Sequence, residues 1–188
     1  MLGVIETRAR QARHLAKRFF ASLSDERPSV AEDQWVRSWL LPEEEQLWAQ
    51  MTPADQRHAV QVAQEVANSL PHAERPVLAA AVLHDVGKLV SGYRTYARVF
   101  ATLFWGAIPG PYRSRFAFGW SSGDGLGRFG VFRRLGEYRI HPELGRDLLK
   151  AAGSDDFTAA WAAQHHAPID KWTVDPSLGH LLKECDDD

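Results

Sequence analysis

The chain has 188 residues, of which 45% are hydrophobic, and a formal net charge of −2 at pH 7. This length suits one domain, and the hydrophobic fraction excludes an intrinsically disordered chain. The single cysteine, Cys185, excludes an internal disulfide framework and fits a reducing cytoplasm. The longest apolar run, residues 99–108, is too short to span a bilayer, and no apolar signal-peptide core precedes it. We therefore expect a soluble, cytoplasmic protein.

The first half of the chain has helical periodicity. Residues 4–23 place apolar side chains along one stripe and basic side chains largely opposite it, which predicts a basic amphipathic helix. Residues 1–50 are expected to form a helical extension that packs on the core through this stripe. Thr52 as an N-cap before Pro53 predicts a helix over 52–70. Residues 74–86 predict another helix that ends near Gly87.

The second half adds three predicted helices, over 142–153, 154–166 and 176–185. No strand ladder or internal repeat is found, so the sequence predicts an all-α fold. Residues 106–130 are rich in glycine and aromatic residues, which predicts a flexible loop inserted in the helical domain. One role for such a loop would be a lid. This segment contains Gly125-Leu-Gly127-Arg-Phe-Gly130, a dinucleotide-binding glycine pattern. No predicted strand or βαβ unit surrounds that pattern, so the match is weak evidence for a dinucleotide-binding site.

Histidine and carboxylate residues recur on the predicted helices, mostly at their ends. Each one alone has an ordinary explanation as a core residue. Taken together, imidazoles and carboxylates at several helix ends can converge on one pocket and hold a metal ion. The residues concerned are His58, His84, Asp85, His141, His165, His166 and Asp186.

The order of these residues, with "HDVGK" at 84–88, "HPELGRDLL" at 141–149 and "HH" at 165–166, resembles the HD superfamily of metal-dependent phosphohydrolases. The resemblance implies an HD-type helical bundle over residues 51–188, with an arginine-rich, aromatic insert at about 92–138. The ligands common to members with one ion would be His58, His84, Asp85 and Asp186. His141 and His165 match the additional ligands of members with two ions, and Asp85 would bridge those ions. His166 would be a further ligand or would donate a hydrogen bond to one of the ligands.

The implied activity is hydrolysis of a phosphoester or phosphoanhydride in a nucleotide or another small phosphorylated molecule. Divalent ions neutralise phosphoryl oxygens and lower the pKa of bound water towards about 7, which supplies hydroxide. Asp85 and Lys88 would be catalytic, with Lys88 beside the substrate phosphate. Gly87 would keep the backbone small where substrate approaches. The expected cofactor is a pair of divalent ions, Fe or Mn before Mg, Zn or Ni.

The sequence departs from the cyclic-di-GMP phosphodiesterase branch of that superfamily. It lacks the "GYP" signature, and Ala54, followed by Asp55, stands where some members supply a glutamate to a third ion. Two ions are therefore expected rather than three.

The insert carries a local excess of arginine, with eight arginines in residues 89–140 against Asp124 and Glu137. One hypothesis is that these arginines contact substrate phosphate while aromatic residues stack on a base. The candidates are Arg94 and Arg98, then Arg113 and Arg115. The alternative is that the arginines form a solvated surface and that Phe100, Phe104 and Trp105 belong to the core.

Two other functions remain open. One is a non-catalytic HD module that binds a metal ion or nucleotide and regulates a partner. The other, ranked lower, is a peripheral membrane protein that uses the helix at 4–23 and the apolar run at 99–108. Nucleic acid is not an expected partner, because only the basic helix favours it and the net charge is negative. No oligomeric state is favoured.

Overall fold

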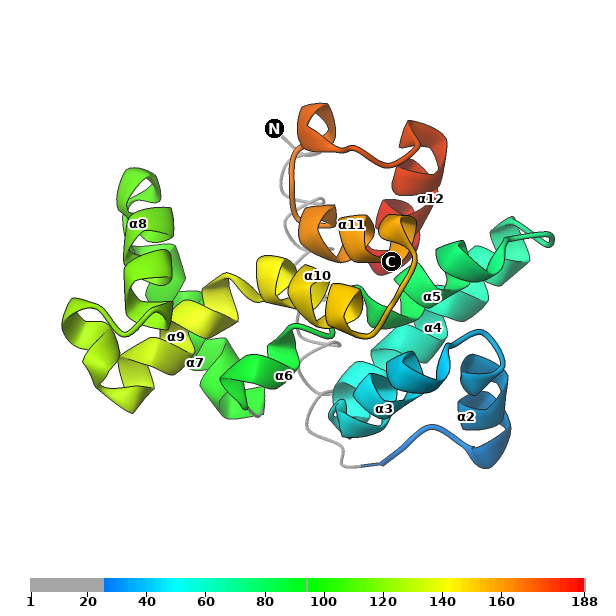
Figure 1. The fold of residues 1–188 in the computed structure, drawn as a ribbon, viewed down its shortest axis with the longest axis horizontal. Coiled ribbons are helices and arrows are strands. Elements are labelled where there is room, and N and C mark those ends of the chain that lie inside the picture. Colours follow the sequence, from blue (N-terminus) through cyan, green and yellow to red (C-terminus); the bar gives the residue numbers. More distant parts are fainter. Residues whose placement is uncertain (1–25, 94, 188) are drawn as a thin grey trace, which may run out of the picture.

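The computed structural model describes residues 26–93 and 95–187, which form helices and no β-strand (Figure 1). The all-α prediction is confirmed. The predicted helix at 4–23 and its packing lie outside the described residues. The helices are α2 (Val30–Arg37), α3 (Pro42–Gln50), α4 (Pro53–Ser69), α5 (Arg75–Leu83), α6 (Lys88–Ser91), α7 (Thr95–Ala107), α8 (Gly110–Ser121), η1 (Gly125–Arg128), α9 (Gly130–Arg139), α10 (His141–Ala151), α11 (Asp156–Gln164), η2 (Ile169–Lys171) and α12 (Pro176–Asp187). None of these helices combines the length and the apolar character needed to cross a bilayer.

The main core is built around α5, in which every residue from Val77 to Leu83 is buried. A helix that is apolar on all sides has to be covered on all sides. Helices α4 and α11 pack directly on α5, α10 packs on α11, and α12 packs on α4. Pro76 in the first turn and the run of alanines favour the helical conformation locally. The core therefore brings together the helices that carry the predicted site residues.

The predicted helix boundaries agree with the structure at most ends. Thr52 caps α4 by accepting a hydrogen bond from the Asp55 backbone N–H, and Pro53 is the first helical residue. Helix α5 ends at Leu83 rather than near Gly87. Residues 84–87 form a tight turn stabilised by i→i+3 hydrogen bonds, such as Val86 N–H to Leu83 C=O, and lead into α6.

The predicted flexible loop at 106–130 is wrong, because this segment forms α8, η1 and the start of α9. Together with α7 these elements project to one side of the main body, on the left in Figure 1. We call α7, α8, η1 and α9 the insert subdomain. It has its own core, in which Trp105 is buried and its Nε1–H donates to the Leu135 C=O at 2.9 Å. Phe100, in contrast, is exposed, so only some of the aromatic residues belong to a core.

Two features of the insert subdomain explain why the loop prediction failed. Most glycines between 106 and 130 have ordinary helical or extended dihedral angles; only Gly123 (φ 86°) and Gly125 (φ 53°), in the turn after α8, have a positive φ. In α9, a Cβ on Gly136 would lie 2.6 Å from the Ala117 C=O, so Gly136 allows α8 and α9 to pack closely. Glycine here serves helix packing as well as turns.

A second glycine contact fixes the turn at 84–87 against α10. A Cβ on Gly87 would lie 1.9 Å from the His141 C=O and 2.6 Å from the Gly145 N, and a Cβ on Gly145 would lie 3.2 Å from the Gly87 N. The space beside Gly87 is therefore filled by the backbone of α10. The expectation that Gly87 leaves room for substrate is wrong, because its small size lets α10 approach the turn.

We predict that Gly87→Ala destabilises the fold, because the new methyl group collides with backbone atoms that side-chain rotation cannot move. The expected loss in unfolding free energy is about 1–3 kcal/mol, measured by urea or thermal unfolding. The control is Gly106→Ala on α7, where a Cβ meets no atom within 4 Å. Equal stability of the two variants would contradict the proposed contact.

Candidate metal centre

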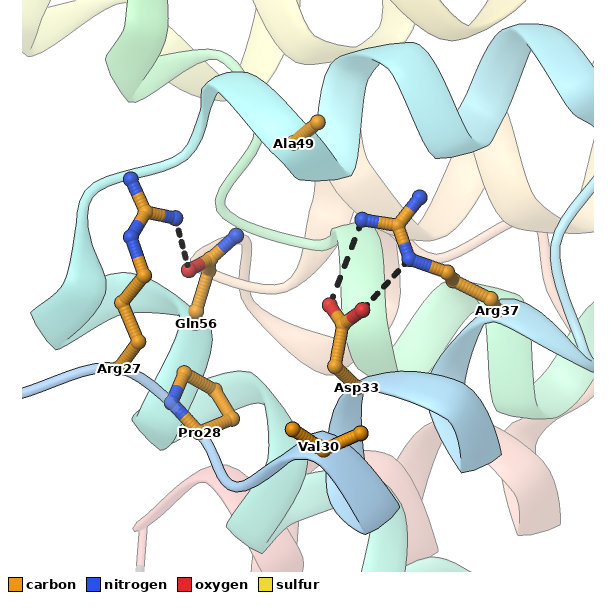
Figure 2. Close-up of a pocket in the computed structure, with 7 residues that line it drawn as sticks. All are labelled: Arg27, Pro28, Val30, Asp33, Arg37, Ala49 and Gln56. Atoms are coloured by element: carbon orange, nitrogen blue, oxygen red, sulfur yellow. Dashed lines mark hydrogen bonds and ion pairs between the residues drawn. The ribbon is translucent and has the colours of Figure 1, made fainter.

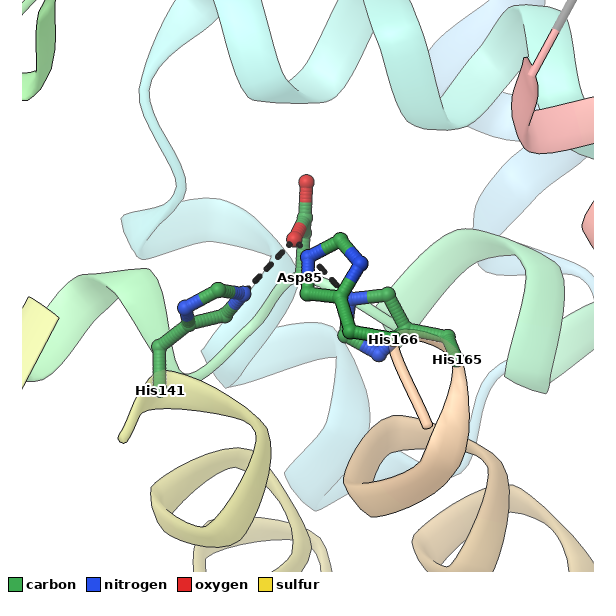
Figure 3. A group of neighbouring side chains, drawn as sticks. All are labelled: Asp85, His141, His165 and His166. Carbon is green, nitrogen blue, oxygen red and sulfur yellow. Dashed lines mark ion pairs between the residues drawn. The ribbon is translucent and has the colours of Figure 1, made fainter. Parts of the chain in front are cut away.

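The structure brings the predicted site residues together from separate helices. His58 comes from α4, His84 and Asp85 from the turn after α5, His141 from the start of α10, His165 and His166 from the end of α11, and Asp186 from α12. Two groups have ligand atoms within 4.8 Å of one another: His58, His84 and Asp85, and Asp85, His141, His165 and His166. Figure 3 shows the second group, with His141 and His165 reaching the same carboxylate from different helices. Asp85 belongs to both groups.

Three of the imidazoles are oriented by the same type of hydrogen bond. The Nδ1–H of His84 donates to the Ala81 C=O, that of His141 to the Tyr138 C=O, and that of His165 to the Ala162 C=O, each at 2.9 Å. Each acceptor lies in the last turn of a helix, where backbone carbonyls lack an i+4 partner. A carbonyl only accepts, so the proton must be on Nδ1. The Nε2 atoms are therefore available as ligands.

These Nε2 atoms point towards Asp85. Asp85 Oδ1 lies 3.4 Å from the Nε2 of His141 and 3.6 Å from that of His165, and Asp85 Oδ2 lies 3.5 Å from the Nε2 of His84. All three Nε2 atoms and Asp85 Oδ1 are buried without a hydrogen-bond partner. A buried polar atom left unpaired costs about 1–3 kcal/mol. Four such atoms lie in one place, in a cluster that could hold a metal ion.

The donor set fits a metal ion better than it fits hydrogen bonds. Charge-assisted N–H···O bonds are about 2.7–2.9 Å long, which is shorter than the distances between Asp85 and the three imidazoles. Two ligand atoms about 2.1 Å from one tetrahedral ion lie about 3.4 Å apart. Burial lowers the pKa of His165, so its neutral ring presents a lone pair to the carboxylate. A cation between them would replace this repulsion by two bonds.

Asp186 adds a carboxylate on the other side of His84. Its Oδ1 lies 3.0 Å from the His58 Nε2 and 3.5 Å from the His84 Nε2. Burial opposes protonation of His84, but the carboxylates of Asp85 and Asp186 outweigh burial and raise the pKa of His84 to about 10. The negative charge of the centre is thus strong enough to hold a proton on His84 where a metal ion would otherwise bind.

Lys88 lies at the edge of this centre, one turn after Asp85. Its ammonium group binds Asp85 Oδ2. Burial alone would lower the pKa of Lys88, but the charges of Asp85, Asp55 and Tyr138 raise it. In return, although burial disfavours the ionised carboxyl, Lys88 and His84 hold the pKa of Asp85 well below its ordinary value. Asp55, buried at the start of α4, also accepts a hydrogen bond from the Thr52 hydroxyl at 2.7 Å.

The arginines of the insert are not placed at the centre by any described contact. Arg94 lies outside the described residues, and Arg98 lies on α7 with a side chain that is not described. Arg113 donates from Nε to the Ile108 C=O at 2.7 Å and from Nη2 to the Gly106 C=O at 3.1 Å, so it caps the end of α7. Arg115 is exposed on α8. Arg113 therefore has a structural role at the end of α7, and its contact with substrate phosphate stays a hypothesis.

The sequence interpretation missed two contributors. Tyr138, the penultimate residue of α9, supplies the carbonyl that orients His141, and its ring centroid lies 6.0 Å from that of His141. Lys183 on α12 lies 3.9 Å from Asp186 Oδ2. The i, i+3 spacing of Lys183 and Asp186 on a predicted helix was a usable signal. Nothing in the sequence indicated Tyr138, because its contact with His141 is made by the backbone C=O and does not depend on the side chain.

A separate pocket of about 290 Å³ is lined by α2, α3 and the start of α4 (Figure 2). Its polar side chains are paired with one another: Arg27 Nη1 donates to Gln56 Oε1 at 3.1 Å, and Arg37 Nε donates to Asp33 Oδ2 at 2.7 Å. Gln56 and His58 are two positions apart on α4, so their side chains leave the helix in nearly opposite directions. This pocket contains none of the candidate ligands.

The chain was compared with known proteins at three levels. No protein-family model, no curated protein and no solved structure matches it.

We predict that a divalent ion stabilises this protein through Asp85. Free metal at about 100 times its Kd should add about 2.7 kcal/mol to the free energy of unfolding, which differential scanning fluorimetry would record as a higher Tm. Asp85→Asn should abolish this increase, because both groups of ligands lose their shared carboxylate. His72→Ala, which removes an exposed histidine outside the centre, should keep it. An increase that survives in Asp85→Asn would place the ion elsewhere.

We also predict that metal affinity rises with pH. Because the pKa of His84 is raised to about 10, this imidazole is protonated in the metal-free centre near neutral pH, and a bound ion has to displace that proton. Displacement of one proton raises the apparent affinity about tenfold per pH unit between about pH 6 and pH 8. Isothermal titration calorimetry in two buffers of different ionisation enthalpy measures the released proton. An affinity that does not depend on pH would contradict the assignment of His84 as a ligand.

Proposed function

We propose that this protein is a metal-dependent phosphohydrolase of the HD type, which cleaves a phosphoester or phosphoanhydride bond in a nucleotide or another small phosphorylated molecule. The observation that carries the proposal is the convergence of three buried, unpartnered imidazole Nε2 atoms on Asp85. The order of the motifs along the chain and the all-helical fold support it further.

We assign two ions to the centre. Asp85 is common to both groups of ligands, with Oδ1 facing His141 and His165 and Oδ2 facing His84. His58 and Asp186 complete one group on the side of His84, and His166 is available to the other. Imidazoles together with carboxylates suit Fe or Mn, and also Zn and Ni, better than Mg, which prefers oxygen ligands.

Bound divalent ions would neutralise phosphoryl oxygens and lower the pKa of water, which makes hydroxide accessible near neutral pH. The chain itself contributes orientation and charge. The helix-end carbonyls hold the imidazoles in one tautomer, so that the ligand atoms need no rearrangement. Lys88 keeps its proton because Asp85 and Asp55 raise its pKa against the effect of burial. Its ammonium group therefore supplies a positive charge for a phosphoryl oxygen at the edge of the centre.

The substrate phosphate would extend from Lys88 towards the insert subdomain. Helix α7 begins a few residues after α6, so Arg94 and Arg98 follow Lys88 closely in the chain. These two arginines remain our candidates for additional phosphate contacts. Arg113 is a weaker candidate, since its guanidinium group already caps α7.

The competing function is a non-catalytic HD module that binds a metal ion or nucleotide and regulates a partner. Such a module could also hold a metal ion at this centre, so metal binding alone does not separate the two functions. Catalytic turnover separates the two functions. Lys88 matters for hydrolysis but not for metal binding, because it is assigned to the substrate phosphate rather than to the ion.

We predict that Lys88→Gln retains the metal but lowers hydrolysis about 10²–10³-fold, because a positive charge near the phosphoryl group is lost. The assay measures phosphate release from p-nitrophenyl phosphate and a panel of nucleotides, on protein loaded with Mn²⁺ or, without oxygen, Fe²⁺. Elemental analysis should find about two ions per chain in the wild type and in Lys88→Gln, and none in the His84→Ala/Asp85→Ala variant.

The matched control is Lys150→Gln, which removes an exposed lysine on α10 and should change neither metal content nor rate. If the metal-loaded wild type hydrolyses nothing in the panel, the hydrolase is replaced by the non-catalytic module. If no ion binds, even after reconstitution with Mn²⁺ or Fe²⁺, the hydrolase fails and a non-catalytic module that binds a nucleotide becomes the leading function.

A further inference from the structure

The insert subdomain exposes most of the large apolar side chains that the described surface carries. Elsewhere in the described residues, the exposed large apolar side chains are Val30, Val90 and Ile169. On the insert subdomain they are Phe100, Leu103, Tyr112, Phe116, Phe118, Leu126, Phe129 and Val131. Several exposed apolar residues in one subdomain mark an interaction surface, whereas single ones are ordinary.

Part of this surface is continuous from α7 to α8. Ring centroids follow one another from Phe100 to Phe104 at 6.2 Å, on to Trp120 at 6.0 Å, to Phe116 at 5.6 Å and to Tyr112 at 6.0 Å. Phe100 and Tyr112, at the two ends of this aromatic strip, are 59% and 54% exposed. The strip is therefore anchored in the subdomain core at its middle and open to solvent at its ends.

The same subdomain is strongly basic. Residues 99–112 contain no charged side chain, and residues 113–136 contain five arginines against one acidic residue, Asp124. Arg115, Arg128, Arg133 and Arg134 are exposed. Arg133 pairs only loosely with Glu137, at 3.6 Å. The subdomain that carries the apolar strip thus has more exposed arginines than carboxylates to neutralise them.

We propose that the insert subdomain is a docking surface for an anionic lipid bilayer. Aromatic rings favour the boundary between acyl chains and headgroups, and exposed arginines bind the headgroup phosphates. Helix α7 has 13 residues, about 20 Å of helix, which is too short to cross the hydrocarbon layer. The subdomain therefore lies in the interface with Phe100, Leu103 and Tyr112 immersed. This proposal goes beyond the hydrolase function and does not depend on it.

Two other occupants fit the surface less well. A second copy of the chain, paired through a two-fold axis, would bring two arginine-rich subdomains together, and like charges across an interface are unfavourable. Nucleic acid would satisfy the arginines, but interfaces with nucleic acid are polar, so Leu103, Leu126 and Val131 would gain nothing. An anionic bilayer satisfies both the charges and the apolar side chains.

Vesicle sedimentation with the full chain tests the proposal. We expect binding to vesicles of phosphatidylcholine and phosphatidylglycerol in equal parts, weak binding to pure phosphatidylcholine, and release as salt rises from about 0.1 M to about 0.5 M. Phe100→Ser/Leu103→Ser/Tyr112→Ser should lower the partition coefficient about tenfold or more, as should Arg115→Gln/Arg128→Gln/Arg134→Gln. The control Val30→Ser/Ile169→Ser changes exposed apolar residues of the main body and should bind like the wild type.

Two results would overturn the proposal. One is no binding of the wild type to the anionic vesicles, or equal binding by all variants that retain the wild-type circular dichroism spectrum. The other is a lipid-free dimer, seen by light scattering, that the Phe100→Ser/Leu103→Ser/Tyr112→Ser variant abolishes while vesicle binding persists, because this would assign the surface to a second copy. Neither readout involves metal or hydrolysis, so failure here is separate from failure of the proposed function.

Discussion

The carboxylate of Asp85 is buried between the Lys88 ammonium group and the imidazoles of His84, His141 and His165, and the rest of the centre depends on keeping it ionised there. An isolated buried carboxylate would take up a proton. Here Lys88 and His84 hold its pKa down in spite of burial, while the Nε2 atoms of His141 and His165 face it without a hydrogen-bond partner. The carboxylate of Asp85 and the unpartnered imidazole nitrogen atoms around it are ligand types that bind divalent cations.

The imidazoles can face Asp85 because of where helices end. Each of three histidines donates to a carbonyl in the final turn of a helix, so a backbone group that helix geometry leaves unpaired sets the tautomer of a candidate ligand. The close contact of Gly87 with α10 then brings the turn after α5 next to His141. Backbone packing, as much as side-chain identity, decides the separation of the ligand atoms.

The insert subdomain is joined to this centre at both of its ends. Lys88 begins α6, which precedes α7, and the last turn of α9 supplies the Tyr138 carbonyl that orients His141. Helices α6 and α9 also pack on each other. A partner that bound the insert subdomain would therefore act on elements that continue directly into the candidate ligands, so the two proposals concern adjacent parts of one structure.

The sequence by itself determined the all-α class and which helix carries or directly precedes each candidate ligand, including His141 at the start of α10. Local signals suffice for this, because caps, prolines and apolar periodicity act within a few residues. It did not reveal that residues 106–130 are helical. There glycine obscured the repeat of Tyr112, Phe116 and Trp120 every four residues, and α8 and α9 pack on one another through Gly136. Only the tertiary structure decided the role of Gly87, the capping by Arg113 and the exposure of the aromatic strip, because each depends on contacts between segments that the order of residues does not specify.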